Sequence, residues 1–202
     1  MKLVSLDLQY TSPGHVEHWL NEQKADIYCF QRQWQKKSPT ISHAVLPTFA
    51  RLGMREGHSI GLQTYFCEPT FHLIDLGLTN HRPIEARWFE FSCKGGLQWN
   101  RVNVGEKEIY VLNLLAQGGN TTRRLYDMQT FFEESPVPMV IVGEILPSPW
   151  RMSRDETIIF LKNCGLKHYG MSIFARGVKL QSLDAHHLSE KLTAKVFDFE
   201  IP

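Results

Sequence analysis

The sequence predicts an α/β (α+β) fold in which two β-sheets pack face to face and helices cover their outer faces, a four-layer α/β/β/α sandwich. Segments in which apolar and polar residues alternate far outnumber segments with helical periodicity. Long runs of adjacent strands are separated by only a few helices. No internal repeat, low-complexity tract or linker interrupts the pattern, so residues 1–202 are expected to form a single domain.

Most of the chain is assigned to strands. Apolar and polar residues alternate from Lys2 to Gln9, which predicts the first strand. Residues 32–57 are rich in Lys, Ser, Pro and Gly and predict a surface loop. Further strands are expected at residues 27–30, 59–66, 84–93, 97–104, 108–114, 139–142, 172–174, 179–182 and 194–200.

Helices are expected at three places. Ser12 and Pro13 predict a helix start, with Ser12 as N-cap and Pro13 at the first helical position. A second helix, capped by one of two threonines, is expected over residues 121–134. Ser153 and Glu156 form a capping-box pattern for a third helix. This helix is expected to end at Gly165.

The composition indicates a soluble, cytoplasmic protein. Apolar residues make up 43% of the 202 residues, and the formal net charge is +1. A net charge so close to zero does not indicate a nucleic-acid partner, and the longest apolar stretches fall short of the roughly 20 residues that span a membrane. No secretory signal is expected, because polar residues interrupt the first apolar run. The four cysteines are scattered without a CxxC pair, which suits a reducing compartment: Cys29, Cys67, Cys93 and Cys164.

The order of segments resembles the endonuclease/exonuclease/phosphatase (deoxyribonuclease-I-like) superfamily over essentially the whole chain. The first strand of that family ends in Asn, where this chain has Asp7. The family's Leu-Gln-Glu corresponds to Phe30-Gln31-Arg32, and its Asn-Thr-His-Leu to Asn113-Leu114-Leu115-Ala116. Its Gly-Asp-Phe-Asn corresponds to Gly143-Glu144-Ile145-Leu146. An Ile-Asp strand and a closing Ser-Asp-His match Gly170-Met171-Ser172 and Ser189-Glu190-Lys191.

The resemblance implies a metal-dependent phosphoester site whose chemistry this chain has largely lost. In the family, carboxylates and an Asn hold Mg²⁺ and a water, and two His assist proton transfer. Here the main metal-ligating Glu is replaced by Arg32, which repels a cation. Leucine and lysine stand at the His positions, and neither shuttles protons near neutral pH. The cleft positions carried over from the family are Asp7, Gln31, Arg32, Asn113, Leu115, Glu144, Leu146, Met171, Glu190 and Lys191.

One hypothesis accounts for the acids that remain. Arg32, helped by Lys191, is expected to take the charge role of the lost metal and to neutralise a partly buried cluster of carboxylates. No intact catalytic residue, metal or other cofactor is then expected. The alternative is a rebuilt site in which Asp7, Glu144 and Glu190 bind Mg²⁺ or Mn²⁺.

Other features have simpler interpretations. His186 and His187 invite a metal site, but adjacent residues on a strand point to opposite faces and no third ligand has suitable spacing. Basic clusters such as Arg32–Lys37 are assigned to solvated surface, with phosphate-backbone binding as the alternative. Trp34 and Trp150 fall in polar contexts, where exposed aromatic rings would indicate a partner surface.

The sequence therefore favours a catalytically inactive member of this superfamily that acts by binding a protein or a phosphate-bearing ligand. The second hypothesis is a divalent-metal-dependent phosphodiesterase or nuclease with a rebuilt acidic site. The third is a structural subunit of a larger assembly. Fold alone does not decide among them, because function depends on the residues of the site.

Overall fold

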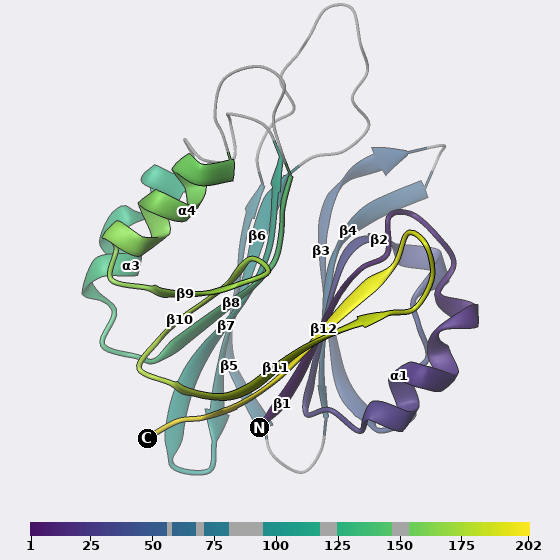
Figure 1. Ribbon diagram of the computed structural model, residues 1–202, viewed down its shortest axis with the longest axis horizontal. Coiled ribbons are helices and arrows are strands. Elements are labelled where there is room, and N and C mark those ends of the chain that lie inside the picture. Colours follow the sequence, from purple (N-terminus) through teal and green to yellow (C-terminus); the bar gives the residue numbers. More distant parts are fainter. Residues whose placement is uncertain (56–57, 68–70, 81–94, 118–124, 147–153) are drawn as a thin grey trace, which may run out of the picture.

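The computed structural model describes residues 1–55, 58–67, 71–80, 95–117, 125–146 and 154–202. Two six-stranded sheets lie face to face (Figure 1). Strand order in the first sheet is β11-β12-β1-β2-β4-β3, and in the second it is β5-β6-β7-β8-β10-β9. Within each sheet a single central pair is parallel, β1 with β2 and β7 with β8, and the other pairs are antiparallel.

The strands of the first sheet are β1 (Lys2–Asp7), β2 (Ile27–Trp34), β3 (Ala44–Arg55), β4 (His58–Cys67), β11 (Lys179–His187) and β12 (Thr193–Glu200). Those of the second are β5 (Phe71–Asn80), β6 (Gly96–Val104), β7 (Lys107–Gln117), β8 (Met139–Leu146), β9 (Lys167–Gly170) and β10 (Ile173–Arg176). Short 3₁₀ turns occur at η1 (Pro13–His15) and η2 (Gln35–Lys37).

Helices cover both outer faces, which confirms the predicted four layers (Figure 1). Helix α1 (Glu17–Gln23) lies on the first sheet, where Val16 and Leu20 are buried among apolar side chains of β1, β2 and β12. Helices α3 (Gln129–Glu134) and α4 (Arg154–Asn163) lie on the second sheet, with Phe132 and Phe160 buried beneath them. A third apolar cluster fills the space between the sheets. Among the helices described, none is long and apolar enough to cross a membrane.

The predicted loop over residues 32–57 is wrong. Strand β2 continues to Trp34, and the edge strand β3 occupies Ala44–Arg55. The prolines of this segment were part of the composition that favoured a loop, but a strand at the edge of a sheet can hold a proline, and Pro47 of β3 is exposed there. Trp34 is also only 7% exposed, so it does not form the aromatic partner surface considered above.

Other element boundaries differ from the expectations. The chain after Ser12 forms η1 and only then α1, and the Ser12 side chain makes no cap hydrogen bond. Strands β5 and β9 were not predicted, whereas the expected strand at 84–93 and Trp150 lie outside the described residues. The second expected helix is described only from residue 125 onward: residues 125–126 are helical, a turn follows at 127–128, and α3 occupies Gln129–Glu134. The strands expected at 97–104, 108–114 and 194–200 are confirmed.

Candidate functional site

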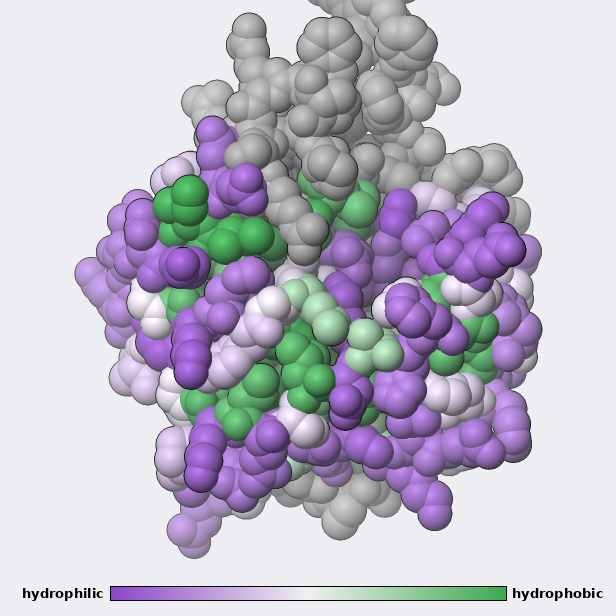
Figure 2. Space-filling view, in the orientation of Figure 1, coloured by the Kyte–Doolittle hydropathy of each residue, from purple (hydrophilic) through white to green (hydrophobic). Residues whose placement is uncertain are grey.

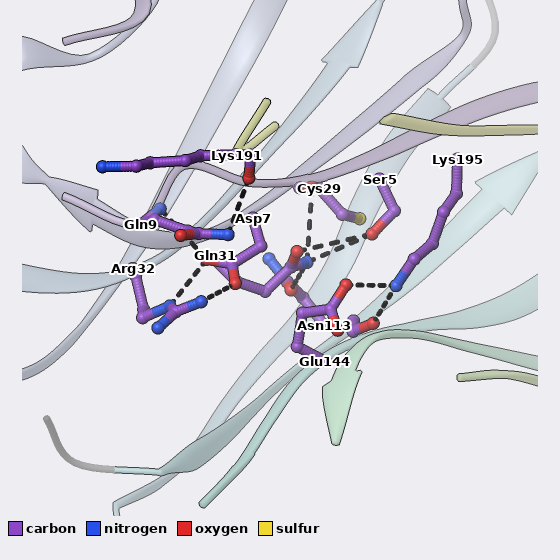
Figure 3. Close-up of polar contacts among 11 residues, drawn as sticks. Ser5, Asp7, Gln9, Cys29, Gln31, Arg32, Asn113, Glu144, Lys191 and Lys195 are labelled. Atoms are coloured by element: carbon purple, nitrogen blue, oxygen red, sulfur yellow. Dashed lines mark hydrogen bonds and ion pairs between the residues drawn. The ribbon is translucent and has the colours of Figure 1, made fainter. Parts of the chain in front are cut away.

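The two parallel strand pairs bring the candidate residues together between the sheets. Asp7 ends β1 and Arg32 lies near the end of β2, while Asn113 and Glu144 lie on β7 and β8 of the facing sheet. Hydrogen bonds cross from one sheet to the other at this place, from Gln31 to Asn113 and from Lys195 to Glu144 (Figure 3). The site is therefore assembled from the central strands of both sheets.

Arg32 forms an ion pair with Asp7. Its Nε donates to Oδ1 of Asp7 at 2.8 Å and its Nη2 donates to Oδ2, so the pairing is bidentate. The two side chains are 17% and 8% exposed. Arg32 has a φ of 48° and lies where the register with β4 shifts between Phe30 and Gln33. Such a bulge re-aims a side chain, and here it turns the guanidinium toward the end of β1.

A second ion pair joins Lys195 of β12 to Glu144 of β8. The ammonium donates to the Glu144 carboxylate and, at 2.8 Å, to the backbone carbonyl of Gly143. The lysine side chain is 9% exposed and the glutamate side chain 24%. Each of the two acids thus has a cation of the same chain as its partner, and Figure 3 shows the two pairs at opposite ends of the site.

Gly143 permits the close approach of β7 and β8 at this site. Its φ is 148°, and a Cβ added to it would lie 1.8 Å from the carbonyl oxygen of Leu114. A side chain at this position therefore requires movement of the backbone of β7. The Gly143 carbonyl accepts a hydrogen bond from Lys195, and Glu144 follows it on β8.

Gln31 and Asn113 form a buried polar link between the sheets. Nε2 of Gln31 donates to Oδ1 of Asn113 at 2.6 Å, and Nδ2 of Asn113 donates to the carbonyls of Phe30 and Gln63 at 3.1 Å each. Both amide side chains are fully buried. A ladder of buried polar side chains continues from them between the sheets: Ser5, Thr64, Gln98, Thr48 and Asn100. The ladder is part of the interior, where paired polar groups hold the sheets in register.

The thiol nearest to this ladder is chemically inert. Burial raises the pKa of Cys29 to about 12, and a hydrogen bond with Thr64 lowers it only in part. The thiolate, which is the nucleophilic form, is therefore almost absent near neutral pH. Cys29 serves the packing between the sheets and offers no covalent catalysis.

Comparison with known proteins rests on structure. No protein-family model matches the sequence, and a search of curated protein sequences finds no significant relative. A functionally unknown conserved protein from Enterococcus faecalis matches with a TM-score of 0.71 and 12% identity, covering 100% of both chains. The human Nocturnin catalytic domain with bound sulfate matches at 0.67 and 12% identity, covering 99% of this chain and 93% of that one.

A third similar structure is that of an endonuclease/exonuclease/phosphatase. The endonuclease/exonuclease/phosphatase from Bacteroides vulgatus matches with a TM-score of 0.66 and 10% identity, covering 100% of this chain and 98% of that one. The chain has the endonuclease/exonuclease/phosphatase fold. The identities are low, so the likeness establishes the architecture and leaves the activity to the residues of the site.

Leu115, the position at which the family resemblance places one of the two His, has apolar surroundings. Leu115 is buried in a cluster with Ala50, Leu52 and Leu62, with Leu146 packed against it. Met171 is 40% exposed and, with Ser172, has a positive φ in the turn between β9 and β10. None of these side chains can transfer a proton near neutral pH.

Arg32 pairs with Asp7, as expected, but the other expected members of the cluster, Glu144, Glu190 and Lys191, do not join this pair. Glu144 is paired with Lys195, which the sequence analysis did not single out. Lys191 is exposed and contributes its backbone carbonyl, which accepts a hydrogen bond from Gln9 at 2.7 Å. Glu190 is exposed as well, and it takes part in none of the ion pairs found among the described residues. The charges are balanced in two separate pairs and not in one cluster.

A divalent metal does not fit the donors at this site. Asp7 and Glu144 are each bound by a cation, and a metal would have to displace both. Across the described ranges, no three His, Cys, Asp or Glu side chains gather closely enough to hold a metal ion. His186 lies against the ring of Trp19, and Nδ1 of His187 lies 3.0 Å from the Thr193 hydroxyl, consistent with the simpler interpretation of that pair.

Lys195 was detectable in principle. It is the one basic residue within the strand Ala194–Glu200, and period two places it on the same face as Phe197 and Phe199. Both phenylalanines are buried between the sheets. A lysine on a buried strand face needs an anionic or carbonyl partner, and this requirement is the signal that would have identified it.

Proposed function

We propose that this chain is a catalytically inactive protein of the endonuclease/exonuclease/phosphatase fold that acts by binding a protein or a phosphate-bearing ligand. The observation that carries the proposal is the pairing of both remaining acids with cations of the same chain, Asp7 with Arg32 and Glu144 with Lys195. Carboxylates held in this way are poor ligands for Mg²⁺, which needs several hard oxygen donors. The proposed function requires no metal.

The loss of proton-transfer groups supports the same conclusion. Leu115 and Lys191 stand where the resemblance places two His, and Leu115 is buried in an apolar cluster. Removal of one electrostatic donor from an active site typically lowers the rate by about 10²–10³. Here the metal ligands and both imidazoles are replaced together, so the combined loss is expected to abolish turnover.

Arg32 supports binding of an anion at the edge of the site. Asp7 uses Nε and Nη2 of its guanidinium, which leaves Nη1 outside that pair. Guanidinium groups bind carboxylates and phosphates in a planar, bidentate way. The Nocturnin structure holds a sulfate, so the same fold accommodates an anion of this kind in at least one protein.

The experiment is an assay of DNA, RNA and a generic phosphodiester, each with Mg²⁺ and with Mn²⁺. The native protein is compared with Glu144→Ala, with Glu144→Gln as the variant of equal size, and with Glu134→Ala as an exposed control on α3. We expect no hydrolysis by the native protein above that of the Glu144 variants. Metal-dependent turnover that both Glu144 variants lose and Glu134→Ala retains would overturn the proposal and establish a rebuilt acidic site.

A purification experiment separates the binding protein from a structural subunit. The native chain is purified under mild conditions and its molar mass is measured in solution. A stoichiometric partner that stays bound in high salt indicates a permanent assembly. Weak, salt-sensitive association is expected for the exchangeable binding proposed here.

A further inference from the structure

The loop after β1 has an unusual backbone. Gln9 and Tyr10 have φ values of 49° and 65°, and Arg32, which faces them from β2, has a φ of 48°. Residues other than glycine adopt such values at a cost in free energy, and they persist where the surrounding structure holds them. Strain of this kind gathers at sites where a protein presents groups to a ligand.

Hydrogen bonds hold this loop against its neighbours. The Tyr10 amide donates to the carbonyl of Arg32 at 3.2 Å, and the Trp34 indole donates to the carbonyl of Tyr10. The Gln9 side chain donates to the carbonyl of Lys191 at 2.7 Å. Figure 3 shows Gln9 and Lys191 at the end of the site that holds the Arg32–Asp7 pair. The loop is thus hydrogen-bonded both to β2 and to the segment before β12.

Cations and aromatic rings contact one another where this loop meets β2 and η2. The Arg32 Cζ lies 5.7 Å from the centre of the Tyr10 ring, and the Tyr10 ring packs edge-on against Trp34 at 6.2 Å. The Lys37 ammonium lies 5.9 Å from the centre of the Trp34 ring. Contacts between a cation and a ring fix the position of long basic side chains, which are otherwise mobile. The rings therefore serve to place positive charges.

The result is a basic surface, which we call the β1 rim: Gln9, Tyr10, Arg32, Lys36, Lys37 and Lys191. Its three lysines are exposed, and Glu190 is the exposed acid next to Lys191. The charge is local, because the whole chain has a formal net charge of only +1. Since the Arg32 charge is matched by Asp7, the lysines set the sign of the rim.

We propose that the β1 rim binds an acidic segment of a partner protein. This inference rests on the proposed function and specifies the partner. The exposed lysines are complementary in charge to a run of Asp and Glu side chains, and the exposed Gln9 side-chain amide can bond to a peptide backbone.

Two features favour an acidic peptide over single-stranded nucleic acid. Proteins that bind single strands present aromatic faces on which bases stack, whereas Trp34 is 7% exposed and its ring is used by Lys37 and Tyr10. A nucleic-acid surface is also usually part of a strongly basic protein, and this chain is nearly neutral.

The experiment measures fluorescence anisotropy of a labelled oligoglutamate peptide and of a labelled oligothymidylate of equal charge, both at low salt with EDTA. The rim variant carries Lys36→Ala, Lys37→Ala and Lys191→Ala. The control variant carries Lys162→Ala, Lys167→Ala and Lys179→Ala, which are exposed lysines of α4, β9 and β11. Both variants lose the same charge, so a general effect of net charge acts equally on them.

We expect the native chain to bind oligoglutamate more tightly than oligothymidylate. The rim variant is expected to bind oligoglutamate roughly tenfold more weakly, from about 0.5 kcal/mol for each exposed pair, and the control variant within about twofold of the native chain. Equal weakening in both variants, tighter binding of oligothymidylate, or no binding of oligoglutamate would overturn the inference. Because EDTA excludes metal-dependent turnover, these results are independent of the hydrolysis assay that tests the proposed function.

Discussion

Arg32 binds both carboxylate oxygens of Asp7, and it does so from a bulge in β2 with a positive φ. The residues of β2 pair with β4 up to Phe30 and again from Gln33, on either side of the bulge. Within β2, the positive φ is therefore confined to the residue that neutralises Asp7. A pair that is mostly buried contributes little net free energy but is costly to break, because one charge is left without a partner.

The first prediction concerns this pair. Asp7→Ala is expected to lower the free energy of unfolding by about 3 kcal/mol, since it leaves the Arg32 guanidinium uncompensated. The double variant Asp7→Ala/Arg32→Ala is expected to be more stable than the sum of the two single variants predicts. Urea denaturation measures all three. Asp184→Ala, at an exposed position on β11, is the control and is expected to stay within about 0.5 kcal/mol of the native protein. Additive losses would show that the two residues do not interact.

The second prediction is an asymmetry between Glu144 and Lys195. The lysine side chain is the more buried of the two, at 9% against 24%. Glu144→Ala leaves the buried Lys195 ammonium with the Gly143 carbonyl as its remaining partner at this site. This variant is expected to lower the free energy of unfolding by about 2 kcal/mol. Lys195→Met removes the buried charge and leaves a carboxylate that water can reach, at an expected cost below about 1 kcal/mol. Chemical denaturation distinguishes them, and a larger loss for Lys195→Met would contradict the argument.

The third prediction concerns Gly143. Gly143→Ala is expected to cost at least about 3 kcal/mol, because its Cβ would meet the Leu114 carbonyl in addition to the backbone strain. Gly105→Ala is the matched control, with a φ of 61° and no neighbouring atom within 4 Å of the added Cβ. It measures the cost of a Cβ at a positive φ without a neighbouring atom, about 1 kcal/mol. Equal losses of thermal stability in the two variants would show that the contact with β7 is unimportant.

The fourth prediction concerns metal ions. The thermal midpoint of the native protein is expected to be the same in EDTA as in Mg²⁺ or Mn²⁺, because both acids are already paired. Arg32→Glu places a carboxylate beside Asp7, and this variant is expected to gain about 2–6 °C on addition of Mn²⁺. Arg32→Gln has no added acid and serves as the control. A metal-dependent midpoint in the native protein would contradict the assignment of Arg32 and Lys195 as the cations of the site.

Much of the fold could be predicted from sequence because the pattern of apolar residues is strong in the central strands. The buried runs in β2 and β8 follow from burial on both faces of the strand. The alternation in β1 arises because its polar residues Ser5 and Asp7 are buried against polar partners, Gln31 and Arg32. Strand β3 was missed because an edge strand has fewer buried residues, and its proline and its glycine resemble a loop. The bulge at Arg32 leaves no signal in the residue pattern.

The candidate site was only partly predictable. Asp7, Arg32 and Glu144 were identified because they stand at positions of a known motif. Lys195 lies outside the motif, and its role depends on which β8 residue faces it across the two sheets. Lys191 was assigned by sequence position alone, and its side chain is exposed to solvent. Pairing across sheets depends on their relative placement, which local sequence does not encode.

The polar ladder from Gln31 and Asn113 to Thr48 and Asn100 has a consequence for how the protein unfolds. Apolar layers can slide past each other at small cost, but these amides and hydroxyls lose their partners as soon as either sheet shifts by one residue. The two sheets are therefore expected to separate together in a single transition and not to drift through intermediate registers. In native-state hydrogen exchange, the backbone amides of β2 and β7 are then expected to exchange only through global unfolding.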